Sequence, residues 1–215
     1  MTAKAQPDYR RIRRKPEVAE ALILDTAEAL LREQPFRELA IDDLMARTGM
    51  RRSSFYSYFR DRNEIVVRLV DRIGGQMFAV ADRWLVGPTD DGPEDVRQAL
   101  REVARVYAAH GPVLAAIAEA AHHDDQVEEV FRGLIDRFST AVAKRIRSEK
   151  RAGRSTVSNP DLTAQALMLM NERFLAERLG REPQDRPAQV ARILEQIWMR
   201  TIYGDDPTRN RPSSG

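Results

Sequence analysis

The chain has 215 residues, a formal net charge of +2 at pH 7 and no cysteine, so a disulfide framework, a thiol nucleophile and a zinc–cysteine site are excluded. Hydrophobic residues at 42% and charged residues at 32% are typical of a folded chain with a sizeable core. No apolar stretch approaches the roughly 20 residues that cross a bilayer, and the polar N-terminus does not resemble a signal peptide, so we expect a cytoplasmic protein with no membrane partner.

A basic cluster lies near the N-terminus. Its five members directly precede Pro16 and are Arg10, Arg11, Arg13, Arg14 and Lys15. Such runs are often solvated tails, although they also bind nucleic acid. Which of these two interpretations applies depends on the residues that follow.

Three helices are predicted within the first sixty residues. The spacing of apolar residues predicts a helix over 17–34, which Pro35 ends. A second, short helix over 41–48 ends at Gly49, which tolerates the left-handed backbone of a tight turn. A third begins near Arg52 and carries Phe55 and Phe59 on one face, because they are four residues apart.

A long helix follows, and the rest of the pattern is also helical. Asp61 is the predicted N-cap of the long helix, which ends before Gly87-Pro88. After a loop over 87–93, helical spacing recurs at about 94–109, 112–121, 124–152, 160–179 and 187–203. No segment alternates as a strand does, so we expect an all-α protein. Gly74 and Gly75 in the long helix indicate either close packing or a place where it can bend.

Residues 41–65 carry the most specific pattern in the chain. The third helix contains the aromatic run Phe55-Tyr56-Ser57-Tyr58-Phe59, and the next helix opens with Arg62-Asn63-Glu64-Ile65. This segment resembles the helix-turn-helix signature of the TetR family of transcriptional regulators. The resemblance implies a repressor, not an enzyme, that binds palindromic double-stranded operator DNA as a homodimer and is released by a small-molecule effector.

The helix-turn-helix separates into a small core and a polar surface. Leu44, Met50, Phe55 and Phe59 are the expected core. The residues expected to contact DNA are the exposed polar and aromatic ones, namely Arg51, Arg52, Ser53, Ser54, Tyr56, Ser57 and Tyr58. The two serines suit helix capping as well. The resemblance assigns a phosphate contact to Tyr56, and Arg62 at a helix start can hold another.

With this motif accepted, the basic cluster becomes a DNA-binding arm made of Arg10, Arg11, Arg13 and Arg14. The segment also departs from the family pattern. Met45 stands where small residues are usual, Ala40 and Arg51 where hydroxyl caps are common, and Arg62 in place of a lysine. These departures leave open which side chains read bases.

Two later segments resemble the closing helices of the EthR branch of that family. They are Leu167-Met168-Leu169-Met170-Asn171-Glu172-Arg173 and Ile197 to Gly204. The resemblance implies a channel for a hydrophobic effector, with Asn171 as a polar anchor and Trp198 in its wall. Tyr107, Phe131, Phe138 and Met168 are the other expected lining residues. Ordinary core packing remains open for the aromatic residues, as does a bond from Asn171 to a neighbouring helix or water.

The resemblance also implies that the helices at about 160–203 pair with their symmetry mates, and Leu194 and Ile197 are the positions expected in that interface. The resulting architecture is a three-helix helix-turn-helix module (1–62) joined by a long helix to a helical ligand-binding and dimerisation body (63–204), with a disordered tail (205–215).

Two other functions compete with a ligand-released repressor. The first is a DNA-binding dimer that is regulated by a protein partner or functions without a ligand. The second is a helical enzyme, for which His122-His123-Asp124-Asp125 is the only suggestive cluster. Adjacent residues on a helix diverge, however, so we expect neither a metal site nor a catalytic residue there, and no cofactor.

Overall fold

The computed structural model describes residues 15–87, 91–181 and 184–204. Within these ranges the regular structure is entirely helical, as predicted. The elements are α1 (Pro16–Glu33), the 3₁₀ turn η1 (Phe36–Glu38), α2 (Ile41–Thr48), α3 (Arg52–Phe55), α4 (Arg62–Val86), α5 (Gly92–Ala121), α6 (Asp125–Arg151), α7 (Pro160–Leu179) and α8 (Pro187–Tyr203). None of the described helices combines the length and the apolar character that a membrane span requires.

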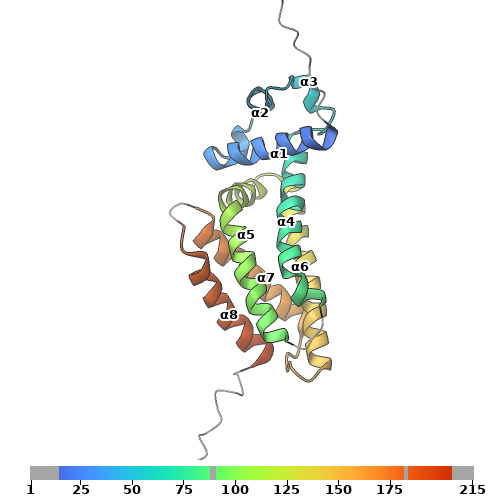
Figure 1. Ribbon diagram of the computed structural model, residues 1–215, viewed down its shortest axis with the longest axis vertical. Coiled ribbons are helices and arrows are strands. Elements are labelled where there is room, and N and C mark those ends of the chain that lie inside the picture. Colours follow the sequence, from blue (N-terminus) through green and yellow to red (C-terminus); the bar gives the residue numbers. More distant parts are fainter. Residues whose placement is uncertain (1–14, 88–90, 182–183, 205–215) are drawn as a thin grey trace, which may run out of the picture.

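The molecule is elongated, with α1, α2 and α3 gathered at one end and α5 to α8 forming the rest (Figure 1). Helix α3 is a single turn of four residues, shorter than the helical pattern suggests. The turn η1 was not predicted. It fills the gap between α1 and α2 because the Phe36 side chain is buried there, only 4% exposed.

Helix α4 links the two ends. Its predicted N-cap is confirmed, because the Asp61 carboxylate accepts a hydrogen bond from the Glu64 N–H at 3.0 Å. The helix then runs for 25 residues, from its contact with α1 to the far part of the body (Figure 1). Since α4 belongs to both ends, it fixes how they are oriented relative to each other.

Helix α5 corrects the prediction of two helices at 94–109 and 112–121, because it passes without a break through Pro112. A proline inside a helix removes one N–H, which leaves the carbonyl four residues earlier without its usual partner. Here the Ala108 carbonyl accepts a hydrogen bond from Gln184 Nε2 at 3.1 Å, and the next carbonyl, of Ala109, accepts one from Arg32 at 2.7 Å. These bonds from outside the helix compensate for the proline.

Gly111 lies next to Pro112 at a close helix contact. A Cβ atom at this position would stand 1.9 Å from the Leu179 carbonyl oxygen at the end of α7. Only a glycine therefore lets α5 approach this backbone, and the Gly111-Pro112 pair is a packing seam rather than a helix boundary.

We predict that Gly111→Ala lowers the free energy of unfolding by about 1–3 kcal/mol, because the new methyl group would overlap backbone atoms that cannot rotate away. Gly133→Ala in α6 is the matched control, since nothing lies within 4 Å of a Cβ there. Helix propensity should make that control neutral or more stable by up to about 1 kcal/mol. Urea denaturation measures both, and equal stability of the two variants would contradict the seam.

Candidate nucleic-acid interface and internal cavity

The turn between α2 and α3 is built from local hydrogen bonds. The Thr48 hydroxyl donates to the Met45 carbonyl at 2.8 Å and accepts from the Met50 N–H at 3.2 Å. Gly49 adopts the expected left-handed backbone, with φ of 68°. Behind the turn Phe55 and Phe59 are buried with their ring centroids 5.4 Å apart. The short helix α3 is thus fixed by its buried face.

The opposite face of α3 is open to solvent. Five of the predicted DNA-binding residues are exposed, namely Arg51, Arg52, Ser53, Tyr56 and Ser57, whereas Ser54 and Tyr58 are partly buried. The Arg52 guanidinium forms an ion pair with Asp42 Oδ2 at 2.6 Å, so a carboxylate that the sequence pattern did not single out holds it in place. The four arginines of the predicted arm, Arg10, Arg11, Arg13 and Arg14, lie outside the described residues.

Arg62 is held by the protein itself. Its guanidinium donates to the Arg37 carbonyl at 3.1 Å and lies 5.0 Å from the centroid of the Phe36 ring. The side chain therefore joins η1 to the start of α4, a structural role that its position at a helix start did not reveal. Its contact with a phosphate stays a prediction.

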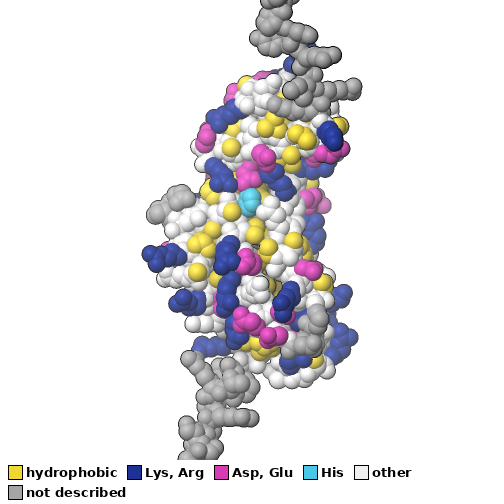
Figure 2. Space-filling view, in the orientation of Figure 1, with side chains coloured by type: hydrophobic (Ala, Val, Ile, Leu, Met, Phe, Trp, Pro, Cys, Tyr) yellow, Lys and Arg dark blue, Asp and Glu magenta, His cyan; other side chains and the backbone are white. Residues whose placement is uncertain are grey.

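A polar joint connects α1 to the body. Its centre is Glu28, which is 8% exposed and accepts from Arg32 at 2.9 Å, from Arg72 at 2.6 Å and faces His110 Nδ1 at 2.6 Å. The other ring nitrogen of His110 lies 3.0 Å from Gln76 Oε1. Figure 2 shows acidic, basic and histidine side chains together at the level where α1 meets the body.

The charges of this joint favour the ionised glutamate. Burial raises the pKa of Glu28, but hydrogen bonds from Arg32 and His110 and the charge of Arg72 outweigh it, so the pKa lies below its ordinary value. We call Glu28, Arg32, Arg72 and His110 the Glu28 cluster. Its members come from α1, α4 and α5, so it sets how the N-terminal helices sit on the body.

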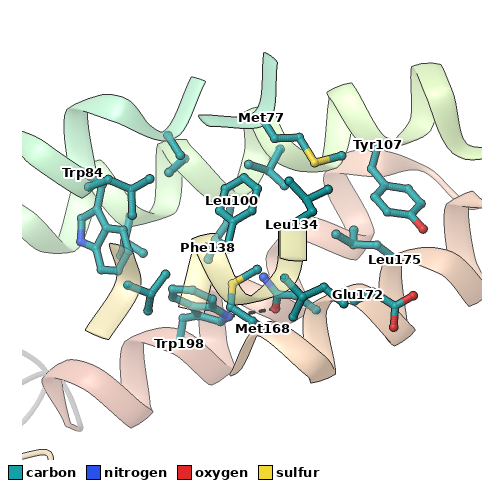
Figure 3. Close-up of a pocket in the computed structure, with 18 of the residues that line it drawn as sticks. Met77, Trp84, Leu100, Tyr107, Leu134, Phe138, Met168, Glu172, Leu175 and Trp198 are labelled. Atoms are coloured by element: carbon teal, nitrogen blue, oxygen red, sulfur yellow. Dashed lines mark hydrogen bonds between the residues drawn. The ribbon is translucent and has the colours of Figure 1, made fainter. Parts of the chain in front are cut away.

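An apolar cavity of about 90 Å³ lies inside the body between α4, α5, α6, α7 and α8 (Figure 3). All six residues predicted to line a channel face it, namely Tyr107, Phe131, Phe138, Met168, Asn171 and Trp198. Met77, Trp84 and Leu134 were not predicted to line it. They belong to apolar patterns that fit a core equally well, so no sequence signal separates them from core residues.

Asn171 and Trp198 hold each other in the cavity wall. The indole N–H donates to Asn171 Oδ1 at 2.9 Å, and both side chains are buried. The asparagine oxygen is therefore bonded to a neighbouring helix, α8, which was one of the two alternatives. The amide N–H₂ group forms no hydrogen bond with the described residues and stays free to donate to a ligand.

The two ends of the cavity differ in chemistry. Trp84 and Trp198 lie at one end, with ring centroids 5.6 Å apart, and Tyr107 and Glu172 lie at the other (Figure 3). Burial raises the pKa of the Tyr107 hydroxyl, helped by the charge of Glu172, and burial also raises the pKa of Glu172. Glu172 was not predicted to be functional. The sequence feature that could have indicated it is the position of this charged residue beside Asn171 in a run of leucines and methionines.

Helices α7 and α8 expose large apolar side chains on their outer surface. Leu162, Leu169, Ile193 and Ile197 are 37–62% exposed. Leu194, however, is only 1% exposed and packs inside its own protomer, so its expected place in a subunit interface is wrong. Leu194 directly follows Ile193 in α8. A helical pattern alone does not show which of these two residues faces the interior of the protomer and which faces outward.

His122 and His123 are exposed, and among the described residues no three histidine, cysteine or acidic side chains come together as metal ligands. The two features that remain are the exposed polar face of α3 and the apolar cavity of the body.

Comparison with known proteins finds family models for both parts of the chain. The model of bacterial regulatory proteins of the tetR family matches residues 23–69, and the model of the C-terminal domain of the transcriptional regulator EthR matches residues 96–204. The chain is 31% identical over 194 residues to the HTH-type transcriptional regulator EthR of Mycolicibacterium smegmatis, covering 87% of this chain and 88% of the relative. The regulator EthR of Mycobacterium tuberculosis H37Rv is 30% identical over 190 residues, with the same coverage.

Solved structures share the fold at low sequence identity. A TetR-family transcriptional regulator from Syntrophomonas wolfei, described as putative, superposes with a TM-score of 0.75 at 14% identity, over 86% of this chain and 95% of that one. The fatty acid degradation regulator FadR from Bacillus halodurans gives a TM-score of 0.74 at 12% identity, with the same coverage.

We predict that Glu28→Gln lowers the free energy of unfolding by about 1–3 kcal/mol at neutral pH, because it leaves the guanidinium groups of Arg32 and Arg72 without this buried carboxylate. A lowered native pKa contributes stability above the ordinary glutamate pKa, and this contribution is lost as the pH falls through the native value. The difference between wild type and variant should therefore vanish under acid conditions.

Glu20→Gln is the control, because Glu20 also lies on α1 but has a single ion pair, with Arg68 at 3.5 Å. Chemical denaturation over a range of pH measures all three proteins. A loss in Glu28→Gln that did not change with pH would show that charge is not what the cluster contributes.

Proposed function

Because the chain belongs to the TetR family of transcriptional regulators and carries an EthR-type C-terminal domain, we propose that it is a repressor released from its operator by an apolar small molecule. Members of this family bind operator DNA and dimerise, and they are not enzymes. Beyond family membership, we propose that the chain represses transcription, that a ligand releases it from its operator, and that this ligand is apolar.

The observation that carries the proposal is the shared helix α4. Near its start Ile65, Val66 and Leu69 are fully buried where α4 contacts α1, while Met77, Ala81 and Trp84 line the cavity further along. A change in the shape of the cavity therefore acts on the same helix that supports the helix-turn-helix.

The size of the cavity supports a ligand-driven change. A cavity of about 150 Å³ is known to accept benzene, and the cavity here measures about 90 Å³. A ligand larger than benzene must therefore displace the wall. Leu134 of α6 is the residue that transmits this displacement, since it lines the cavity and a Cβ at Gly74 of α4 would stand 2.5 Å from its side chain.

On the DNA side we assign base and phosphate contacts to the exposed face of α3. In this proposal Arg51, Arg52, Ser53, Ser54 and Ser57 meet the major groove, and Tyr56, Tyr58 and Arg62 contact the flanking backbone. The N-terminal arm adds sequence-independent contacts to phosphates or the minor groove. Two recognition helices reach successive major grooves only about 34–36 Å apart, so a tilt of α4 in each subunit ends tight binding.

We divide the chain accordingly into a DNA-binding module (1–62) and a body (63–204), with α4 as the connector. We also assign dimerisation to the exposed apolar side chains of α7 and α8, because burying Leu162, Leu169, Ile193 and Ile197 against a second copy removes them from water. A twofold dimer matches a palindromic operator.

We predict that Ile197→Glu converts the dimer to monomers and weakens operator binding at least about a hundredfold, because each half-site then loses the contribution of its partner. Light scattering measures the oligomeric state, and fluorescence anisotropy measures binding to DNA selected from a random pool. Val86→Glu is the control, since Val86 is 70% exposed at the end of α4, outside the proposed face. If Ile197→Glu stayed dimeric, the interface would lie elsewhere.

We predict that octan-1-ol, used as an apolar probe, raises the melting temperature of the protein. It should also bind more weakly when selected operator DNA is present, and the factor should equal the one by which octanol weakens DNA binding.

Gly74→Ala should weaken octanol binding about fivefold or more, because the new methyl group drives Leu134 into the cavity. Gly75→Ala is its control, with nothing within 4 Å of a Cβ.

The outcomes separate the competing functions. Equal probe affinities with and without operator would contradict induction by this cavity. No response to any apolar probe would favour the other candidate, a dimer regulated by a protein partner or by no ligand.

A further inference from the structure

The cavity ends in two polar groups without partners. Tyr107 of α5 is 5% exposed, and its hydroxyl forms no hydrogen bond with the described residues. Glu172 of α7 is partly buried, and its carboxylate makes neither a hydrogen bond nor an ion pair within the described chain. In Figure 3 both side chains lie at the same end of the cavity, with their oxygen atoms pointing away from the apolar interior.

The nearby basic side chains are engaged elsewhere. Arg173, the next residue in α7, pairs with Glu177 at 2.5 Å. His122, directly after α5, uses Nδ1 to contact the Ala118 carbonyl at 2.7 Å. Both influence Glu172 only through their charge at a distance, which acts against the effect of burial on its pKa. Among the residues that the structure describes, the carboxylate thus lacks a direct counter-ion.

An unpaired carboxylate at the edge of an apolar cavity costs free energy that a hydrogen-bond donor restores. Asn171 does not supply that donor, since its hydrogen bond is to Trp198 and none joins its amide to Glu172 among the described residues. A carboxylate only accepts hydrogen bonds, and a tyrosine hydroxyl can accept one as well. The pair therefore fits a donor, and a positively charged donor best.

The position of Glu172 also gives a ligand a way in. Phe131, Ile135 and Glu172 line the cavity and also a large outer groove of about 1020 Å³ between α5, α6 and α7. Carboxylates outnumber arginines in that groove by five to three; the carboxylates are Glu119, Glu128, Asp136, Glu172 and Glu177. A cation in the groove thus meets an excess of acidic side chains, with Glu172 as the one that also lines the cavity.

We propose that the effector is an elongated apolar molecule ending in a protonated amine, whose ammonium group is bound by Glu172 and Tyr107 at the mouth while its apolar part occupies the cavity. This inference rests on the proposed ligand response and specifies its chemical class. A bound ammonium favours the ionised carboxylate, which opposes the effect that burial has on the pKa of Glu172.

Three probes with one chain length test the proposal on the full-length protein, by calorimetry and thermal shift at neutral pH. They are octylamine, octan-1-ol and octanoate. Octylamine should bind about tenfold more tightly than octanol, and octanoate more weakly than either, because only the amine presents a charged donor to Glu172.

Glu172→Gln should remove the preference for octylamine while leaving octanol binding within about twofold, because the variant keeps the shape and loses the charge. Tyr107→Phe should reduce the preference about threefold and serves as a second variant if the first does not fold. Asp136→Asn is the control, since Asp136 lines the outer groove but not the cavity. It should keep the preference.

The possible failures can be told apart. If octylamine and octanol bound wild type equally well, or if Glu172→Gln kept the preference, the amine inference would be overturned while the ligand response stood. If none of the three bound, the proposed ligand-released function would fall and the inference with it.

Discussion

Helix α4 has one buried face that runs from its start to its end, and the two ends of the molecule depend on it in different ways. Ile65, Val66, Leu69, Val70 and Ile73 are fully buried, and Trp84, near the other end, is only 2% exposed. Protein interiors are close-packed, so a helix of this kind moves as a unit or not at all. The helix-turn-helix cannot keep its orientation if the cavity wall contributed by α4 changes place.

The Glu28 cluster limits which movements α4 can make. Arg72 lies on α4 itself and bonds both Glu28 and Asp25 of α1, each at 2.6 Å. His110 of α5 contacts the same glutamate from the body. A tilt of α4 must therefore exchange one set of charged contacts for another. Such exchanges favour two discrete arrangements over a continuous range, which is what an on–off response to a ligand requires.

Short-range signals explain what could be predicted from the sequence. The predicted bounds 160–179 and 187–203 agree with α7 and α8 because prolines begin both helices and glycines follow them. The same signal misled at Pro112, where bonds from Gln184 and Arg32, 76 and 77 positions away from the carbonyls they reach, keep the helix continuous. No local pattern contains such partners.

In the candidate site, too, some features could be predicted from the sequence and others depend on contacts between distant residues. The family resemblance indicated six residues that do lie around one cavity, although ligand binding by them remains a proposal. It did not indicate Glu172, or Leu134 against Gly74, because these matter only through the space between helices. The Glu28 cluster escaped prediction for the same reason, since His110 stands 82 positions from its partner.

The seam at Gly111-Pro112 adds a second connection between the two ends, beside that made by α4. The carbonyls near the proline join α5 to the segment after α7 through Gln184 and to α1 through Arg32, which itself pairs with Glu28. Helix α7 carries Asn171 and Glu172 on its cavity side and Leu169 on its outer side. In the proposed function, a ligand that shifts α7 therefore acts on the outer surface assigned to dimerisation directly and on the helix-turn-helix through this seam, so both proposed determinants of operator spacing respond to the same occupied cavity.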